Sequence, residues 1–334
     1  MSVKSETTRV LSTVLYRSGL LGPLSNAVGY ARRVKGFPVL GFHRVNDDDD
    51  PFMPALPTGL FAARMEHIAR HYTVFTVEDL VERLRHGQVP RKALALTFDD
   101  GYRDNLTHAA PILARYGLPA TIFLTTGHIG TSEMLWFDRL ALALKRTARA
   151  QLALGRQTVL PLGSTTERLR ALQVALRHLK NLPDSERRHT LDQLVVELGS
   201  GPLEGPKRLM LSWDEVGALR GLGFSIGAHT VSHPILSRLS PEDAWREIND
   251  SKLAIERALG TRARAFAYPN GGAEDVTDLT VRLVKDAGFA CAVTTRRGLN
   301  TSTTPLLELR RGGPWERHLP TYALKLARYQ QTGA

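Results

Sequence analysis

The sequence predicts an α/β protein, a closed or nearly closed barrel of parallel strands with a helical insertion. Short apolar, β-prone runs alternate with amphipathic helical segments along most of the chain, a pattern typical of parallel strands joined by helical crossovers. The number of these units favours a closed or nearly closed barrel over an open sheet. Several residues capable of chemistry directly follow predicted strands, and barrel active sites lie at the carboxyl ends of their strands.

The N-terminal segment, residues 1–35, reads as a basic amphipathic element, separate from the barrel. Helical spacing of apolar residues runs from Thr8 to Val34, with a break at Gly22-Pro23, and arginines flank it. Such a helix either packs on its own domain or lies on a membrane surface. Both interpretations stay open.

The barrel itself is expected over residues 36–320, followed by a C-terminal tail at 321–334. The predicted strands cover 38–43, 93–98, 120–124, 224–228, 265–268, 289–293 and 306–309. The predicted helices cover 60–71, 77–85, 106–116, a segment after Ser212, 241–259 and 276–287. Ser212 and Ser240 are expected to cap two of these helices, and Pro241 suits a first helical position.

Residues 136–209 differ in composition and hydrophobic periodicity from the rest of the barrel. They are rich in Leu, Ala and Arg, with helical periodicity and few strand signals. We interpret this stretch as a helical insertion and not as a separate domain. Its basic residues either guide an anionic substrate or form a solvated face.

Composition sets the class of partner and the compartment. The chain of 334 residues has 44 Lys+Arg against 33 Asp+Glu and a net charge of +11, which favours anionic partners. It lacks the aromatic–basic interleaving of a nucleic-acid module, so nucleic acid is not expected. Cys291 is the single cysteine, which excludes an intrachain disulfide and a cysteine-based zinc site. Without a spanning segment or signal-peptide pattern, we expect a cytoplasmic protein, at the inner face of the membrane if the N-terminal helix binds lipid.

Two adjacent carboxylates, Asp99 and Asp100, end the predicted strand 93–98. Burying an unpaired charge is costly, so two anions at a strand's end indicate a cation or a proton-transfer task. The alternative interpretation is an ordinary Asp-Gly turn.

A second motif, His229-x-x-x-His233, follows the predicted strand 224–228 and precedes Pro234. Neutral imidazole is a good ligand for zinc and related ions. Two imidazoles with one carboxylate would leave coordination positions open for water and substrate. One Asp can bind this divalent ion while its neighbour takes a proton from metal-bound water, which suits hydrolysis of an amide or ester.

These motifs resemble those of a known family. Thr97-Phe98-Asp99-Asp100-Gly101 and His229-Thr230-Val231-Ser232-His233 resemble the first two motifs of the polysaccharide deacetylases, carbohydrate esterase family 4 with the NodB homology domain. Phe266-Ala267-Tyr268-Pro269-Asn270-Gly271 resembles a variant of the third. The resemblance covers roughly residues 36–130 and 210–312.

The resemblance implies a distorted (β/α)7-8 barrel of the polysaccharide deacetylase type and an assignment of roles. Asp99 would be the general base, and Asp100, His229 and His233 would bind the metal. The metal we expect is a divalent ion, with Zn²⁺ as the first choice. The reaction would remove an N-acetyl or other N-acyl group from an amino sugar. The backbone N–H of Tyr102 would help hold the oxyanion.

The sequence also departs from the family pattern. The arginine that orients the base in many members is replaced by the run Ala265 to Tyr268, and the histidine motif of the usual general acid is missing. His43, which lies in an element similar to a Tyr-His element of many members, and, less favoured, His318 are candidate acids. Arg310 or Arg311 could orient the base or bind an anionic group. Tyr102, Tyr268, Pro269 and Asn270 are further candidates for substrate binding.

The leading hypothesis is a metal-dependent N-deacetylase acting on an amino sugar in a glycan or a lipid-linked glycan intermediate. Positive charge and the N-terminal helix suit a pyrophosphate-linked lipid at a bilayer face. The alternatives are an amidase acting on a cyclic amide or a formamido sugar, and a non-catalytic glycan- or lipid-binding protein on the same barrel. The sugar, the acyl group and the oligomeric state stay open.

Overall fold

A curled parallel sheet forms the centre of the computed structural model, which describes residues 3–23, 36–155, 157–200 and 208–333. In these residues seven strands pair in parallel in the order β1-β3-β4-β7-β8-β9, with β2 also beside β3. Their bounds are β1 Val39–Phe42, β2 Thr73–Phe75, β3 Ala93–Phe98, β4 Thr121–Leu124, β7 Ser225–Ala228, β8 Ala265–Ala267 and β9 Cys291–Val293. The predicted α/β barrel class is confirmed.

The segment after β9 bridges the sheet back to β1. Leu309 pairs with Val293, and the Gly312 N–H donates to the Val39 carbonyl at 2.9 Å. The strand predicted at 306–309 was wrong, because Leu306–Glu308 forms a 3₁₀ turn (η3) and only Leu309 joins the ladder. Pro305, just before the turn, has no N–H to donate to a strand.

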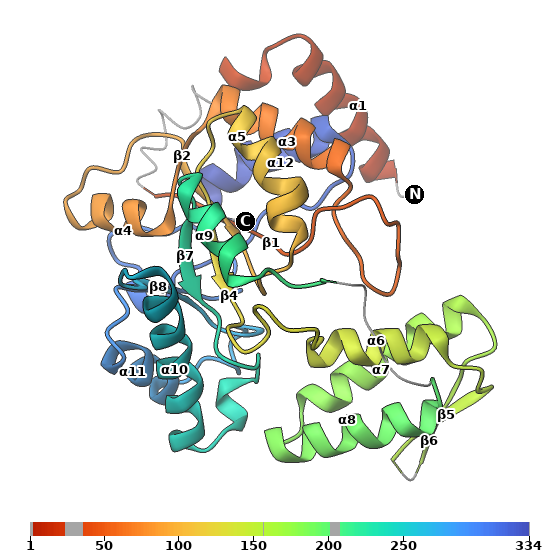
Figure 1. Ribbon diagram of the computed structural model, residues 1–334. Helices are drawn as coiled ribbons and strands as arrows, with labels where there is room; N and C mark the ends of the chain where they lie inside the picture. The colour runs from red at the N-terminus through yellow and green to blue at the C-terminus, as the bar shows by residue number, and fades with distance from the viewer. Residues whose placement is uncertain (1–2, 24–35, 156, 201–207, 334) are drawn as a thin grey trace.

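Helices cover the outside of the sheet as crossovers between its strands (Figure 1). They are α3 Thr58–His71, α4 Val77–Arg85, α5 Ala110–Arg115, α9 Trp213–Gly221, α10 Pro241–Leu259 and α11 Asp278–Asp286, with a second 3₁₀ turn, η2, at Leu236–Arg238. The predicted caps are confirmed, since the side chains of Ser212 and Ser240 accept N–H groups of Glu215 and Asp243. The predicted helix 106–116 begins instead as a π-helical turn, η1 Asn105–Ala109, before α5. Pro111, the second residue of α5, lacks the N–H that would continue a regular α-helical ladder from the preceding turn.

The insertion at 136–209 forms a lobe beside the barrel (Figure 1). It contains α6 Trp136–Arg146, a hairpin of β5 Gln151–Leu154 and β6 Thr158–Pro161, α7 Thr165–Lys180 and α8 Asp184–Leu198. Its apolar side chains form a core cluster of their own, which Phe52 and Met53 join. The hairpin corrects the prediction of a helical insertion. Leu152 and Leu154 are buried in the alternating pattern of a strand. Because leucine is also a good helix former, the sequence pattern did not indicate this strand.

The two ends of the described chain pack together. Helix α1, Val3–Arg17, lies along α12, Leu319–Thr332, and the buried Ser12 Oγ lies 3.1 Å from Thr321 Oγ1. The predicted tail at 321–334 is therefore mostly helix, held by buried side chains such as Tyr322, Leu326 and Tyr329. The predicted break at Gly22-Pro23 was wrong, because α1 ends at Arg17 and the chain turns at 18–20 before it is helical again at 21–23. Residues 24–34 of that prediction lie outside the described residues. None of the described helices is long and apolar enough to cross a bilayer.

Candidate active site

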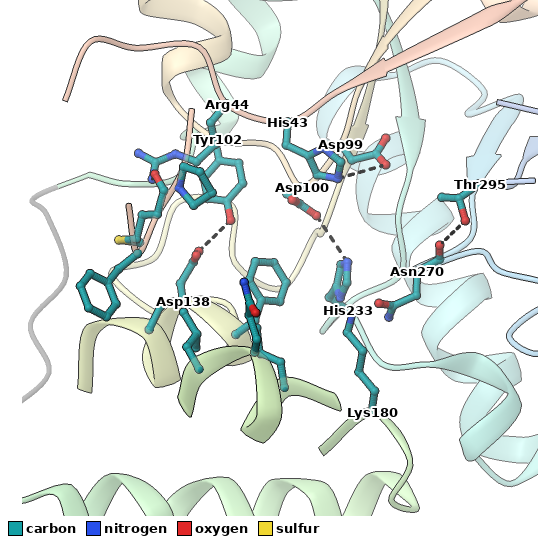
Figure 2. Close-up of a pocket in the computed structure, with 18 of the residues that line it drawn as sticks. His43, Arg44, Asp99, Asp100, Tyr102, Asp138, Lys180, His233, Asn270 and Thr295 are labelled. Atoms are coloured by element: carbon teal, nitrogen blue, oxygen red, sulfur yellow. Dashed lines mark hydrogen bonds and ion pairs between the residues drawn. The ribbon is translucent and has the colours of Figure 1, made fainter. Parts of the chain in front are cut away.

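A cavity of about 590 Å³ opens where the strands end, and it brings most of the predicted site residues together (Figure 2). Asp99 and Asp100 come from the end of β3, His229 from the end of β7 and His43 from the end of β1. This is the position where barrel folds collect reactive side chains.

Asp100, His229 and His233 form a buried cluster that fits a divalent ion. Asp100 Oδ1 lies 3.6 Å from His229 Nε2 and 3.5 Å from His233 Nε2, and it has no hydrogen-bond partner. Ligand atoms of the three residues lie within 4.8 Å of one another. An orphaned buried carboxylate oxygen facing two imidazole nitrogens is an arrangement that a cation would satisfy.

The protonation states of the cluster also suit metal ligation. Burial lowers the pKa of His229 to about 4 and lowers that of His233 well below its usual range, so both imidazoles are neutral near pH 7. Burial, aided by the charge of Asp99, raises the pKa of Asp100. These shifts mark a carboxylate that lacks a compensating positive charge, which a bound dication would supply.

Local backbone geometry aims these ligands. Asp100, Thr230 and His233 have φ of 75°, 67° and 60°, a region that non-glycine residues rarely adopt. Such conformations cost about 1–3 kcal/mol each and persist where the surroundings enforce them. Gly101 follows at φ 85°, where a Cβ would meet Ile129 Cδ1 at 2.9 Å.

Two partners, Ala267 and Glu247, hold the histidine turn, residues 229–233, in place. His229 Nδ1 lies 2.7 Å from the Ala267 carbonyl, and donating there leaves Nε2 with a free lone pair toward Asp100. Glu247 of α10 accepts the N–H groups of Val231 at 2.8 Å and Ser232 at 2.9 Å, and also the Ser232 hydroxyl at 2.7 Å. The turn is thus clamped from outside the cavity.

Asp99 is held by a two-pronged ion pair with Arg311. The two terminal nitrogens of Arg311 each lie 2.6 Å from one carboxylate oxygen, and both side chains are buried. Gly41 leaves room, since a Cβ there would lie 3.3 Å from Arg311 Cδ. Burial works to raise the pKa of Asp99, but Arg311 and His229 outweigh it and the pKa falls below its usual range. Asp99 is therefore an anion over a wide pH range.

The structure separates the other predicted residues. His43 Nε2 lies 3.9 Å from Asp99 Oδ2 in the cavity wall, whereas His318 is at the start of α12 beside Thr321. The His43 side chain is 58% accessible although protein surrounds it on most sides, and this desolvation lowers its pKa against the opposing charge of Asp99. Arg310, next to Arg311, is exposed and does not line the cavity.

Of the candidates for substrate binding, Tyr102, Tyr268 and Asn270 line the cavity and Pro269 does not. The Tyr268 hydroxyl donates to the Leu307 carbonyl at 3.0 Å. The Asn270 carbonyl accepts from Thr295 Oγ1 at 2.7 Å (Figure 2). Tyr102 is buried, and its hydroxyl donates to Asp138 Oδ2 at 2.7 Å.

The insertion contributes lining residues that the sequence interpretation missed. Asp138 of α6, 5% exposed, faces Tyr102, and Lys180 lies at the end of α7. An apolar wall completes this side, formed by Phe52, Met53, Phe137, Ala141, Leu169, Leu172 and Leu176. No local pattern marks these residues, because only the packing of the insertion against the barrel brings them to the site.

Comparison with known proteins agrees with this geometry. A sequence model for the family described as polysaccharide deacetylase matches residues 86–292. The putative polysaccharide deacetylase YxkH of Bacillus subtilis (strain 168) is 21% identical over 263 residues, which span 78% of this chain and 65% of YxkH. A poly-beta-1,6-N-acetyl-D-glucosamine N-deacetylase of Staphylococcus epidermidis is 30% identical over 74 residues, 22% of this chain and 26% of that protein. The chain thus spans less than two thirds of these relatives.

Solved structures share the fold. Deacetylase PplD of Streptococcus pyogenes, in complex with acetate, superposes with a TM-score of 0.55 at 22% identity, covering 84% of this chain and 92% of that one. IcaB from Ammonifex degensii gives a TM-score of 0.56 at 19% identity over 89% and 98% of the two chains. At these identities the likeness establishes the barrel architecture.

Proposed function

The chain belongs to the polysaccharide deacetylase family, and we propose that it is a metal-dependent hydrolase that removes an N-acetyl or other N-acyl group from an amino sugar. One observation carries the proposal. A carboxylate kept ionised by Arg311 lies beside a buried Asp-His-His cluster in a single cavity. This pairing of a base with a metal-ligand set suits amide hydrolysis.

The residues divide the chemistry between them. Asp100, His229 and His233 would hold the divalent ion, for which two imidazoles and a carboxylate favour zinc. The ion supplies a Lewis acid that polarises the acyl carbonyl. Asp99, oriented by Arg311, takes the proton of the attacking water. The Tyr102 N–H is our candidate for stabilising the oxyanion.

We further propose that the amino sugar is lipid-linked. Leu169 and Leu176 of α7 present partly exposed side chains to the same cavity that holds Asp99. Lys180, at the end of α7, lines the same cavity, and its positive charge suits a phosphate. A substrate with an apolar lipid next to a phosphate-linked sugar would satisfy both features, and it would place the enzyme at the inner face of the membrane.

Acetate and formate release test the proposal. The zinc-loaded protein is assayed on a free N-acetylated amino sugar, an oligosaccharide of it, a formamido sugar, a cyclic amide and a pyrophosphate-linked lipid form. We expect acetate release, fastest from the lipid-linked form. Asp99→Asn should lower kcat by ~10²–10⁴-fold and still bind metal, as measured by metal analysis.

Controls separate the parts of the proposal. Leu176→Gln should slow only the lipid-linked substrate, whereas Val196→Gln, on an exposed part of α8, should slow none. Equal rates on free and lipid-linked sugars would refute the lipid proposal alone. Release only from the formamido sugar or cyclic amide would favour the alternative amidases, and metal binding without any hydrolysis would favour a binding protein.

A further inference from the structure

A buried carboxylic acid lies across the cavity from the base. Asp138 is in the first turn of α6 and lines the same cavity as Asp99 and the metal-ligand cluster. In Figure 2, Asp100 lies between Asp99 on one side and Asp138 on the other. Asp138 Oδ2 accepts the hydroxyl of Tyr102 at 2.7 Å, and Tyr102 is only two residues from Asp100, so Asp138 is held close to the end of β3.

Contacts from α6 fix this helix against the histidine turn. Trp136 Nε1 donates to the His233 carbonyl at 3.2 Å, and the Phe137 ring lies edge-on to the His233 ring at 5.2 Å. The next residue, Asp138, is therefore placed by the same packing that places a metal ligand. An aspartate in a first turn also stabilises the helix itself, and the experiment must separate that role.

The surroundings of Asp138 favour its protonated form more than water does. Burial raises its pKa to about 6, against the hydrogen bond from Tyr102 and the charge of Arg44. The Arg44 guanidinium lies over the Tyr102 ring at 5.1 Å and pairs with Asp104 at 3.2 Å. Its charge is therefore partly neutralised by Asp104 and stabilises the ionised form of Asp138 less. An acid with a pKa of about 6 can donate and recover a proton near neutrality.

The other candidate donor occupies a less suitable place. His43 lies 3.9 Å from the base, on the Asp99 side of the cavity, and burial lowers its pKa. The attacking water and the leaving nitrogen are different substituents of one carbon. A proton donor on the cavity wall opposite the base can therefore reach the leaving nitrogen while the base holds the proton taken from water.

We propose that Asp138, supplied by the insertion, is the general acid that protonates the leaving amine. The step rests on the N-deacetylase function proposed above. Water gives its proton to Asp99 and its oxygen to the acyl carbon. The C–N bond breaks, its electron pair stays on nitrogen, and the Asp138 carboxyl proton moves to that nitrogen. The products are the free amine and the carboxylic acid, and exchange with solvent resets Asp99 and Asp138.

Leaving-group dependence tests the assignment. An aryl acetate with a good leaving group needs no proton on departure, whereas an amide does. Asp138→Asn should lower kcat/KM on the N-acetyl sugar by ~100-fold or more and leave aryl acetate hydrolysis within ~3-fold. The basic limb of the amide pH profile, where rate falls as Asp138 loses its proton, should disappear. Asp138→Glu should recover part of the amide rate.

Two further variants make the outcome decisive. Tyr102→Phe removes a hydrogen bond that lowers the pKa of Asp138, so the basic limb should move to higher pH. His43→Gln should retain the difference between amide and ester. Equal losses of amide and ester in Asp138→Asn would reduce Asp138 to a structural residue, and amide-selective loss in His43→Gln would make His43 the acid. A wild-type protein inactive on every amide would overturn the proposed function itself, and this inference with it.

Discussion

Asp99 and Arg311 illustrate how much a single pair of residues decides at this site. A buried carboxylate alone would bind a proton, and a protonated Asp99 could not act as a base. The guanidinium reverses that tendency and also fixes the direction of both carboxylate oxygens through parallel hydrogen bonds. Arg311 is therefore the residue we expect to be least replaceable by another cation.

Substituting Arg311 with lysine keeps the positive charge but loses the two parallel hydrogen bonds to Asp99. We expect Arg311→Lys to lower kcat by about 10–100-fold with metal content unchanged, since Asp99 would be less well oriented. Arg311→Met should raise the pKa of Asp99. In the mechanism we propose, ionised Asp99 is the active form, so the acid limb of kcat/KM should then move to higher pH. Arg310→Lys, on the exposed neighbour, is the matched control. An unchanged kcat in Arg311→Lys would contradict the orienting role, and an unchanged pH profile in Arg311→Met would contradict the effect of the charge on Asp99.

At the scale of elements, helix α10 supports the turn that carries the candidate metal ligands His229 and His233 from outside the barrel. Glu247 satisfies two backbone N–H groups of a turn that includes two non-glycine residues at positive φ, Thr230 and His233. Without that carboxylate the turn would lose the partners that offset its strain. A residue that never touches the cavity thus sets the direction of His229 and His233.

Removing this clamp should weaken the metal site. We expect Glu247→Ala to reduce zinc affinity about 10–100-fold, as measured by competition with a chelator. Glu242→Ala, an exposed carboxylate of the same helix, should leave the affinity unchanged. Equal affinities in the two variants would mean that Glu247 has no role in aiming the ligands.

At the scale of the whole molecule, α1 has an unusual orientation. Its buried Ser12 faces α12, while Val10, Leu11 and Val14 are 61%, 52% and 58% exposed. Val10, Val14 and Arg17 share one helical face, so apolar and basic side chains point to solvent together. This face suits the interface of an anionic bilayer, in line with the lipid-linked substrate we propose.

Flotation with lipid vesicles tests this surface. The full chain should float with vesicles containing phosphatidylglycerol, less with phosphatidylcholine alone, and less again at high salt. The double variant Val10→Ser/Val14→Ser should lose most of the binding, whereas Val159→Ser, an equally exposed valine of the hairpin, should not. Flotation that is unaffected by the double variant would assign membrane binding to another surface.

The sequence by itself determined the alternation of strands and helices, the capped helix starts and the Asp-Asp and His-x-x-x-His motifs. Each of these is a local feature, set by spacing, capping or a few adjacent residues, and so can be read along the chain. The position of the candidate metal ligands and the candidate base could be predicted because the motifs follow strands that must end at one edge of a parallel sheet.

The tertiary structure alone decided the partners that lie far apart in sequence. Asp99 and Arg311 are 212 positions apart, and no local pattern distinguishes Arg311 from Arg310. Asp138 reads as an ordinary first-turn aspartate until α6 packs against the barrel beside Tyr102. The same holds for the helix α12 in place of a tail and for the 3₁₀ turn in place of a strand. In each case long-range packing, which spacing does not encode, selected one of several locally acceptable conformations.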